Sequence, residues 1–256
     1  MPGGAAVALR GGFRLGRIGG VPVEVHPGFF VTAGVLASVY WRSFRLFDVT
    51  LAAALVAVLL VSVLAHECGH ALAARRFKVG TRLIEINVSG GLAHLDGPAW
   101  TTNENCLILL AGPLANLALA AVAYLVFLAL WSDPEAFETA SDWGELIPGL
   151  DLSVVPELFG LQVLRLFVLI NAGLCTVNLL PGFPLDGGRI AFLLLSRRWG
   201  TRTATRAVGV VGVGLSVFSV LLLIGTTLSG FAVLIPPRFR PNWHAVRHPA
   251  KTHPWG

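Results

Sequence analysis

Five long stretches of this chain contain no Asp, Glu, Lys or Arg, and they limit its possible folds more than any other feature. A helix needs about 20 predominantly apolar residues to cross the hydrocarbon core of a bilayer. Stretches of this length and composition therefore predict membrane-spanning helices. They comprise residues 25–41, 49–65, 105–132, 166–185 and 207–237.

The composition supports a membrane protein and excludes several other classes. Charged residues make up 13% of the chain, hydrophobic residues make up 55%, and the mean hydropathy is +0.73. A soluble domain carries about 25% charged residues, so this chain is neither a soluble enzyme nor a disordered protein. Its three cysteines lie in apolar stretches and predict buried thiols, not a secreted disulfide scaffold. In a membrane protein, the net charge of +5 indicates which loops face the cytoplasm. We therefore expect no nucleic-acid partner.

The number of spans depends on the last apolar stretch. Residues 207–237 are long for one span and short for two, so we expect five spans, or six if this stretch is a hairpin broken near residues 225–230. No cleavable signal precedes the first span, which is therefore expected to be an uncleaved anchor. The predicted organisation is an N-terminal segment (1–24), a membrane-embedded core (25–235) and a basic C-terminal tail (236–256).

The distribution of basic residues predicts the orientation, because Lys and Arg favour cytoplasmic loops. Residues 10–17 hold three Arg, which places the N-terminus in the cytoplasm. The basic segments 75–82 and 189–206 are expected on the same side. The connection 133–157 holds seven acidic residues and no basic ones, which suits the outside. The chain is thus predicted to be a multi-pass protein with a cytoplasmic N-terminus.

A possible metal site begins with His66-Glu67-Cys68-Gly69-His70, which fits the pattern H-E-x-x-H. Positions i and i+4 share one helix face, so both imidazoles can hold one metal ion. Glu67 lies beside them and can take a proton from a water molecule that the metal activates. A satisfied polar cluster is the alternative, but two His and a Glu inside a membrane helix are costly without such a partner.

A third ligand is needed, because catalytic zinc usually has three protein ligands and one open position. Asp186 is the stronger candidate, since it is the only carboxylate after Glu157 and directly follows an apolar span. Glu85 and Glu104 remain alternatives. Asp186 could also cap a helix that begins at Gly187.

The predicted topology brings the two half-sites to a similar depth. His66 lies nine residues before Arg75, which is about 13 Å along a helix. Asp186 lies three residues before Arg189 at the end of a span with the same direction. Both half-sites are therefore expected within the membrane, toward its cytoplasmic side.

The chain closely resembles the site-2 protease family of intramembrane zinc metalloproteases. The segment His66–His70 matches the zinc motif of that family, and Asn178–Asp186 matches its N-x-x-P-x-x-P-x-D motif. Gly112–Asn116 matches a third family segment, and Ser89–Ala93 resembles the glycine pair of its re-entrant β-loop. The similarity covers residues 13–225 in the family's order.

This resemblance implies a zinc centre. His66, His70 and Asp186 would bind one Zn²⁺ per chain, and Glu67 would be the general base. It also implies an all-α polytopic membrane protein with five to six transmembrane helices and a small re-entrant β-loop near residues 82–95.

Several other residues would support the site or the substrate. Asn178 and Pro184 match positions that handle substrate beside the metal. Asn116 could orient a ligand or simply join helices. Gly90 and Gly91 would form the glycine pair of the β-loop.

The implied function is an intramembrane zinc endopeptidase of a prokaryotic cell membrane. It would cleave transmembrane segments of membrane-anchored substrates, in regulated proteolysis that releases a cytoplasmic factor. The branch it resembles is compact and includes the sporulation factor-processing protease. Because the connection 132–157 is short and few residues follow Ile235 in this sequence, we expect neither a PDZ domain nor a CBS pair.

Two other functions remain open. A transporter or zinc permease would also use intramembrane His and Asp residues, but its ligands should be distributed across the bilayer. A non-catalytic scaffold relative would be expected to lack Glu67 or a metal ligand. The sequence leaves the oligomeric state undetermined.

Overall fold

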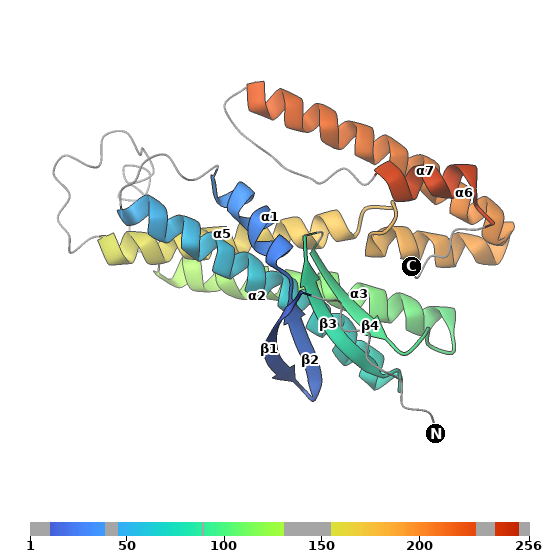
Figure 1. Cartoon of the computed structure of the whole chain (residues 1–256), viewed down its shortest axis with the longest axis horizontal. Coiled ribbons are helices and arrows are strands. Elements are labelled where there is room, and N and C mark those ends of the chain that lie inside the picture. Colours follow the sequence, from blue (N-terminus) through green and yellow to red (C-terminus); the bar gives the residue numbers. More distant parts are fainter. Residues whose placement is uncertain (1–10, 39–45, 89, 131–154, 229–238, 251–256) are drawn as a thin grey trace.

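The computed structural model describes residues 11–38, 46–88, 90–130, 155–228 and 239–250. Within them, four helices are long and apolar enough to cross a membrane. Three of these helices, α2, α3 and α5, pack side by side (Figure 1). The four helices are α2 (Leu46–Arg76), α3 (Thr102–Leu130), α5 (Val155–Asn178) and α6 (Asp186–Leu228).

The structure begins the first apolar helix later than the sequence predicted. Val25 ends strand β2 (Val21–Val25), and α1 (Pro27–Ser38) follows as an apolar helix of 12 residues. His26 precedes a proline, a position that disfavours helical backbone, so the helix begins at Pro27 and not at Val25. The twelve described residues rise about 18 Å, less than a hydrocarbon core of about 30 Å. Residues 39–41 of the expected span lie outside the described part of the chain, so its full length stays a prediction.

The last described span, α6, consists of two helical segments that meet at a kink. Helix α6 joins residues 186–199 to residues 201–228, with non-helical backbone between them at Gly200 (φ 77°, ψ 160°). A positive φ of this kind favours glycine, which explains the bend in Figure 1. The second segment is helical as far as Leu228, inside the expected break at residues 225–230, and residues 229–238 lie outside the described part, so the choice between one span and a hairpin stays a prediction.

A four-stranded sheet packs beside α2, in the order β1-β2-β3-β4. In the region of the expected re-entrant β-loop, β3 (Thr81–Asn87) and β4 (Gly90–Leu95) form an antiparallel hairpin, whereas its re-entry into the membrane stays a prediction. Strand β2 pairs in parallel with β3, and β1 (Phe13–Ile18) pairs antiparallel with β2. The all-α class is therefore incomplete, because the N-terminal segment forms half of this sheet.

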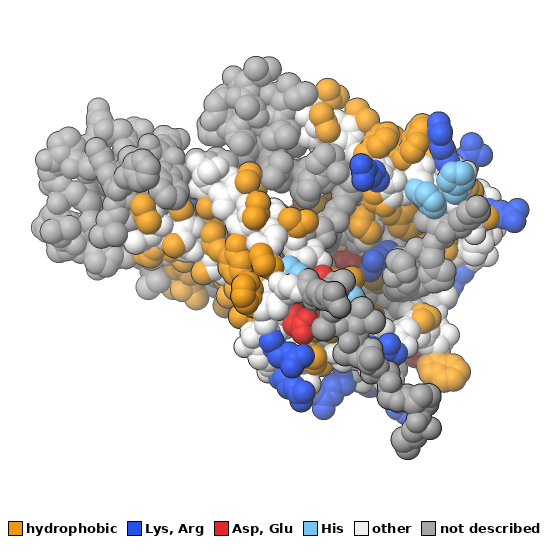
Figure 2. Space-filling view, in the orientation of Figure 1, with side chains coloured by type: hydrophobic (Ala, Val, Ile, Leu, Met, Phe, Trp, Pro, Cys, Tyr) orange, Lys and Arg blue, Asp and Glu red, His pale blue; other side chains and the backbone are white. Residues whose placement is uncertain are grey.

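The surface separates apolar from basic regions. Hydrophobic side chains cover the helices at the left of Figure 2, whereas Lys and Arg gather near the sheet and near α6 and α7 (Phe239–Arg247). The sheet is anchored by a hydrophobic cluster in which Val25 and Ile86 pack against Phe29, Ala33 and Val63. This packing places β3 and β4 against the helix that carries the H-E-x-x-H motif.

Candidate metal centre

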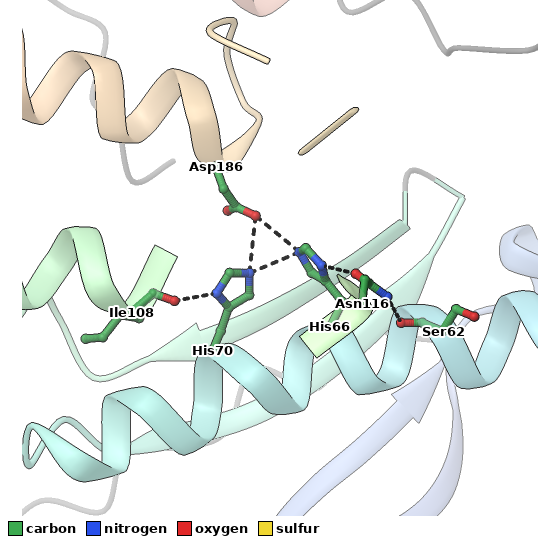
Figure 3. Close-up of polar contacts among 6 residues, drawn as sticks. All are labelled: Ser62, His66, His70, Ile108, Asn116 and Asp186. Carbon is green, nitrogen blue, oxygen red and sulfur yellow. Dashed lines mark hydrogen bonds and ion pairs between the residues drawn. The ribbon is translucent and has the colours of Figure 1, made fainter. Parts of the chain in front are cut away.

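The predicted metal-binding residues meet inside the protein, as Figure 3 shows. His66 and His70 lie one turn apart on α2, and Asp186 is the first residue of α6. The two Nε2 atoms are 3.1 Å apart, and they lie 3.1 Å (His66) and 3.3 Å (His70) from Asp186 Oδ2. All three residues are buried. The structure thus brings together residues 120 positions apart in the chain.

Hydrogen bonds at the far side of each ring orient the two imidazoles. His66 Nδ1 lies 2.6 Å from Asn116 Oδ1, and His70 Nδ1 lies 2.7 Å from the carbonyl oxygen of Ile108. Both partners are acceptors, so each Nδ1 carries the proton and each Nε2 presents a lone pair. The Nε2 lone pairs of both histidines and the Asp186 carboxylate therefore face one another at close range. Such electron-rich groups are stable together when a cation lies between them.

The donor set fits a metal ion of the zinc type. Zinc binds His nitrogen and carboxylate oxygen at about 2.0–2.2 Å in tetrahedral geometry, which separates neighbouring donor atoms by about 3.3–3.6 Å. The three observed separations, 3.1–3.3 Å, lie at or slightly below the short end of this range. His66, His70 and Asp186 supply three ligand atoms, and a fourth position can remain for a reactant.

Asn116, predicted as a support residue, belongs to a buried amide network. Its Nδ2 donates to the carbonyl oxygen of Ser62 (3.0 Å) and to Asn171 Oδ1 (2.8 Å). Asn171 in turn donates to Ser62 Oγ and to the carbonyl oxygen of Phe167, both at 2.8 Å. Because Asn116 Nδ2 donates to both of these acceptors, the Asn116 amide is fixed with its Oδ1 toward His66. The network joins α2, α3 and α5 and reaches the metal-binding cluster at His66.

Sequence reasoning missed Asn171 and Ser62. Asn171 is a fully buried polar residue inside the apolar stretch 166–185, and such residues are rare without a function. Its position was therefore a usable signal, although its partner on another helix was not visible.

Removing Asn171 should weaken metal binding without removing a ligand. In Asn171→Leu, the Asn116 amide loses an acceptor and is free to turn away from His66. Outer partners of this kind are worth about 10–100-fold in metal affinity, so we expect a loss of about ten-fold, measured by chelator competition on purified protein. Thr176→Val is the matched control, since Thr176 is exposed and bonds only within α5. An unchanged affinity in Asn171→Leu would contradict the proposed role of the network.

Two glycines permit close packing at the site. A side chain at Gly112 of α3 would overlap the imidazoles of His66 and His70. A side chain at Gly91 of β4 would overlap the carboxylate of Glu67. The predicted glycine pair is therefore split in role: Gly91 lies against Glu67, whereas Gly90 starts β4 with a positive φ of 118°.

The other predicted residues lie in varied surroundings. Glu67 is buried beside the two histidines and next to β4. Asn178 ends α5, and Pro184 follows Phe183 through a cis peptide bond in the loop before Asp186.

The two alternative third ligands are engaged elsewhere. Glu104 and Thr101 form a capping box at the start of α3, in which each side chain accepts the other residue's backbone N–H. Glu85 lies in the sheet, 3.0 Å from His94 Nε2 and 2.9 Å from Asn87 Nδ2. Burial acts to raise the pKa of Glu85, but hydrogen bonds from Asn87 and His94 and the nearby imidazoles outweigh it, so the pKa is lowered. Neither residue belongs to the metal cluster found among the described residues.

The fold and site together define a membrane-embedded helical protein with a buried His–His–carboxylate centre. A model of Peptidase family M50 matches residues 54–223. The solved site-2 protease from Methanocaldococcus jannaschii shares the fold, with a TM-score of 0.56, 25% identity and coverage of 94% of each chain. The chain therefore belongs to Peptidase family M50, the site-2 protease family, as its motifs predicted.

Curated relatives agree with this assignment. Rip3 of Mycobacterium tuberculosis is 32% identical over 85% of this chain and 52% of its own length. A zinc metalloprotease of Methanocaldococcus jannaschii is 28% identical over 83% of this chain and 53% of its own. Stage IV sporulation protein FB of Bacillus subtilis is 28% identical over 58% of this chain. The chain spans about half the length of the first two relatives.

Proposed function

We propose that this chain is an intramembrane zinc endopeptidase that cleaves transmembrane segments of membrane-anchored substrates. The observation that carries the proposal is the buried cluster of His66, His70 and Asp186 beside Glu67, among helices apolar enough to span a bilayer. Membership of a peptidase family and the zinc metalloprotease relative support the same function. A permease is less favoured, because the three metal-binding side chains lie at one point instead of along a path.

His66, His70 and Asp186 would hold one zinc ion through Nε2, Nε2 and a carboxylate oxygen. When bound, zinc lowers the pKa of water toward 7 and polarises the scissile carbonyl. Glu67 takes a proton from the attacking water and delivers it to the leaving amine. Asn116 and the Ile108 carbonyl keep both imidazoles in the required tautomer and orientation.

Substrate backbone must be exposed before it can be cut, because every N–H and C=O of a membrane helix is paired within the helix. Strand β4 is the last strand of the sheet order and lies against Glu67 at Gly91. An unwound substrate segment can add to this strand edge and present its backbone to the site. Asn178 and Pro184 flank the loop to Asp186 and are proposed to contact the same segment.

Deleting Gly90 and Gly91 should abolish cleavage while metal content stays intact. The deletion shortens the β4 edge that we propose as the docking strand, but it leaves His66, His70 and Asp186 unchanged. Cleavage of a transmembrane reporter and zinc content would be measured on the same purified preparation. Full cleavage by the deletion variant would exclude β4 as the docking edge.

Helix-opening residues in the substrate should control the rate. Gly or Pro weakens a helix by roughly 1–3 kcal/mol relative to Ala, and about 1.4 kcal/mol is ten-fold in rate. Replacing such residues near the cut with Leu or Ala should slow cleavage by about ten-fold or more, without a comparable loss of binding. The measurement is kcat and binding affinity for paired substrates that differ only at these positions. Equal rates for rigid and breakable helices would show that opening is not limiting.

The orientation follows from the charge distribution. We propose that the chain lies in a prokaryotic cell membrane, with its N-terminus and basic segments in the cytoplasm. The metal site would then lie within the membrane, toward its cytoplasmic side. Reporters fused at residue 80 should be cytoplasmic, and reporters at residue 145, outside the described part of the chain, should be external. The reverse pattern would invert the topology and move the expected cut to the external half of the substrate span.

The function itself is tested by comparing membrane proteins from cells that carry the wild-type chain or Glu67→Gln. A transmembrane protein that is cut in the first cells and stays full length in the second is a substrate, and released cytoplasmic fragments would support regulated proteolysis. Identical protein patterns, together with zinc uptake that depends on the chain, would favour a permease instead.

A further inference from the structure

The C-terminal segment holds a helix that packs into the core. Helix α7 lies beside α6 in Figure 1 and buries Asn242 and Ala245 against it. Side chains at Gly209 and Gly212 of α6 would collide with α7, and at Gly212 the collision would be with the Asn242 amide. This segment was predicted only as a basic tail, but its packing shows a fitted contact.

Asn242 binds both backbone polar groups of a single residue. The N–H of Phe183 donates to Asn242 Oδ1 (2.8 Å), and Asn242 Nδ2 donates to the carbonyl oxygen of Phe183 (2.7 Å). The Asn242 side chain is only 1% exposed, so both hydrogen bonds are shielded from water. Loss of either partner would leave buried polar groups unsatisfied, which is costly.

The bound loop leads directly to the metal centre. Phe183 lies three residues before Asp186, and Leu185 N–H donates to the Gly182 carbonyl oxygen (3.0 Å) in a tight turn. A side chain at Gly188, in the first turn of α6, would overlap that same carbonyl group. A shift of Phe183 would therefore be transmitted to the helix start that carries Asp186.

The Phe183 side chain packs from the same side. It forms one cluster with Phe192, Ala204 and Val208 of α6 and with Ala245 of α7. Helix α7 therefore holds the loop by two hydrogen bonds between the Asn242 side chain and the Phe183 backbone and by apolar contact.

We propose that Asn242 is a positioning residue for Asp186. By fixing Phe183, it keeps the Asp186 carboxylate at the two histidine nitrogens and so sets the affinity and geometry of the metal centre. The inference rests on the proposed function only in taking zinc as the metal. It assigns to the C-terminal helix a part in the site although none of its described residues is among the three clustered metal-binding residues.

The test measures metal binding rather than cleavage. Zinc affinity of purified full-length protein would be determined by chelator competition, and the visible absorption of the Co²⁺-loaded protein would report ligand geometry. Asn242→Ala should lower zinc affinity by about ten-fold or more and alter the Co²⁺ spectrum. Asn242→Asp keeps an acceptor for the Phe183 N–H but turns a second acceptor toward the Phe183 carbonyl oxygen, so its loss of affinity should be at least as large. Trp243→Ala is the matched control, because Trp243 is the exposed neighbour on α7.

The outcomes separate the two proposals. If wild-type protein binds zinc and both Asn242 variants, at unchanged thermal stability, bind it equally well with the same Co²⁺ spectrum, the positioning role is wrong. If Asn242→Ala fails to fold, Asn242→Asp decides in the same way. If the wild-type protein binds no metal, the proposed function fails and this inference fails with it. An equal loss in Trp243→Ala would overturn the specific role of Asn242, because any damage to α7 would then suffice.

Discussion

Replacing Glu67 with Gln should lower the rate of peptide cleavage by about 10²–10⁴-fold, the usual contribution of a general acid–base. Gln has nearly the shape of Glu but cannot accept and return the proton. Glu67 is buried beside His66 and His70 and is not one of the three clustered metal-binding residues. The zinc content of Glu67→Gln should therefore equal that of the wild type. The measurement is single-turnover cleavage of a transmembrane substrate, with zinc determined on the same sample.

A control is needed for packing around Glu67, because Gly91 leaves no free space there. Thermal stability of Glu67→Gln should match that of the wild type within a few degrees. Cleavage at the wild-type rate by a correctly folded Glu67→Gln protein would remove Glu67 from the chemistry.

Replacing Asp186 with Ala should remove most bound zinc and all measurable cleavage. The carboxylate is one of three donor atoms that lie 3.1–3.3 Å apart, and its loss leaves two neutral imidazoles. The effect should exceed the 10–100-fold loss of affinity that outer partners cause. His66→Ala and His70→Ala should behave alike, and Asp186→Asn tests the charge with little change in shape. Metal content after dialysis against a weak chelator is the readout.

A zinc-loaded and active Asp186→Ala protein would show that the third ligand is misassigned. Glu104 and Glu85 would then be the variants to test, although Glu104 is held in a capping box and Glu85 is bonded to His94. The control is Glu104→Gln, which should keep its full zinc content.

The sequence predicted the parts of the structure that one local pattern determines. Long apolar runs produced helices α2, α3, α5 and α6 because only a paired backbone is stable in a bilayer. The spacing of His66 and His70 predicted that both share one helix face, and the isolated carboxylate of Asp186 pointed to it as the third member of the cluster. The structure places all three together.

Other parts depend on contacts between distant segments, which no local pattern reveals. The alternating valines of β2 (Val21–Val25) are typical of a strand, but its pairing with β3, some 60 positions later in the chain, could not be predicted from that pattern. The partners Asn171 and Asn242 likewise act on residues 55 and 59 positions away. The start of the first span was wrong, because a charge-free stretch can contain the end of a strand before its helix begins.

The central claim is that this metal centre hydrolyses a peptide bond within a membrane segment, and isotope-labelled water tests it most directly. Purified chain and a transmembrane peptide would be reconstituted in vesicles in H₂¹⁸O, with and without a zinc chelator, and analysed by mass spectrometry. We predict one cut toward the cytoplasmic half of the peptide, one ¹⁸O in the new carboxyl group, and loss of both with the chelator or in Glu67→Gln. An intact peptide beside zinc-loaded protein, or equal cleavage by Glu67→Gln, would contradict the claim.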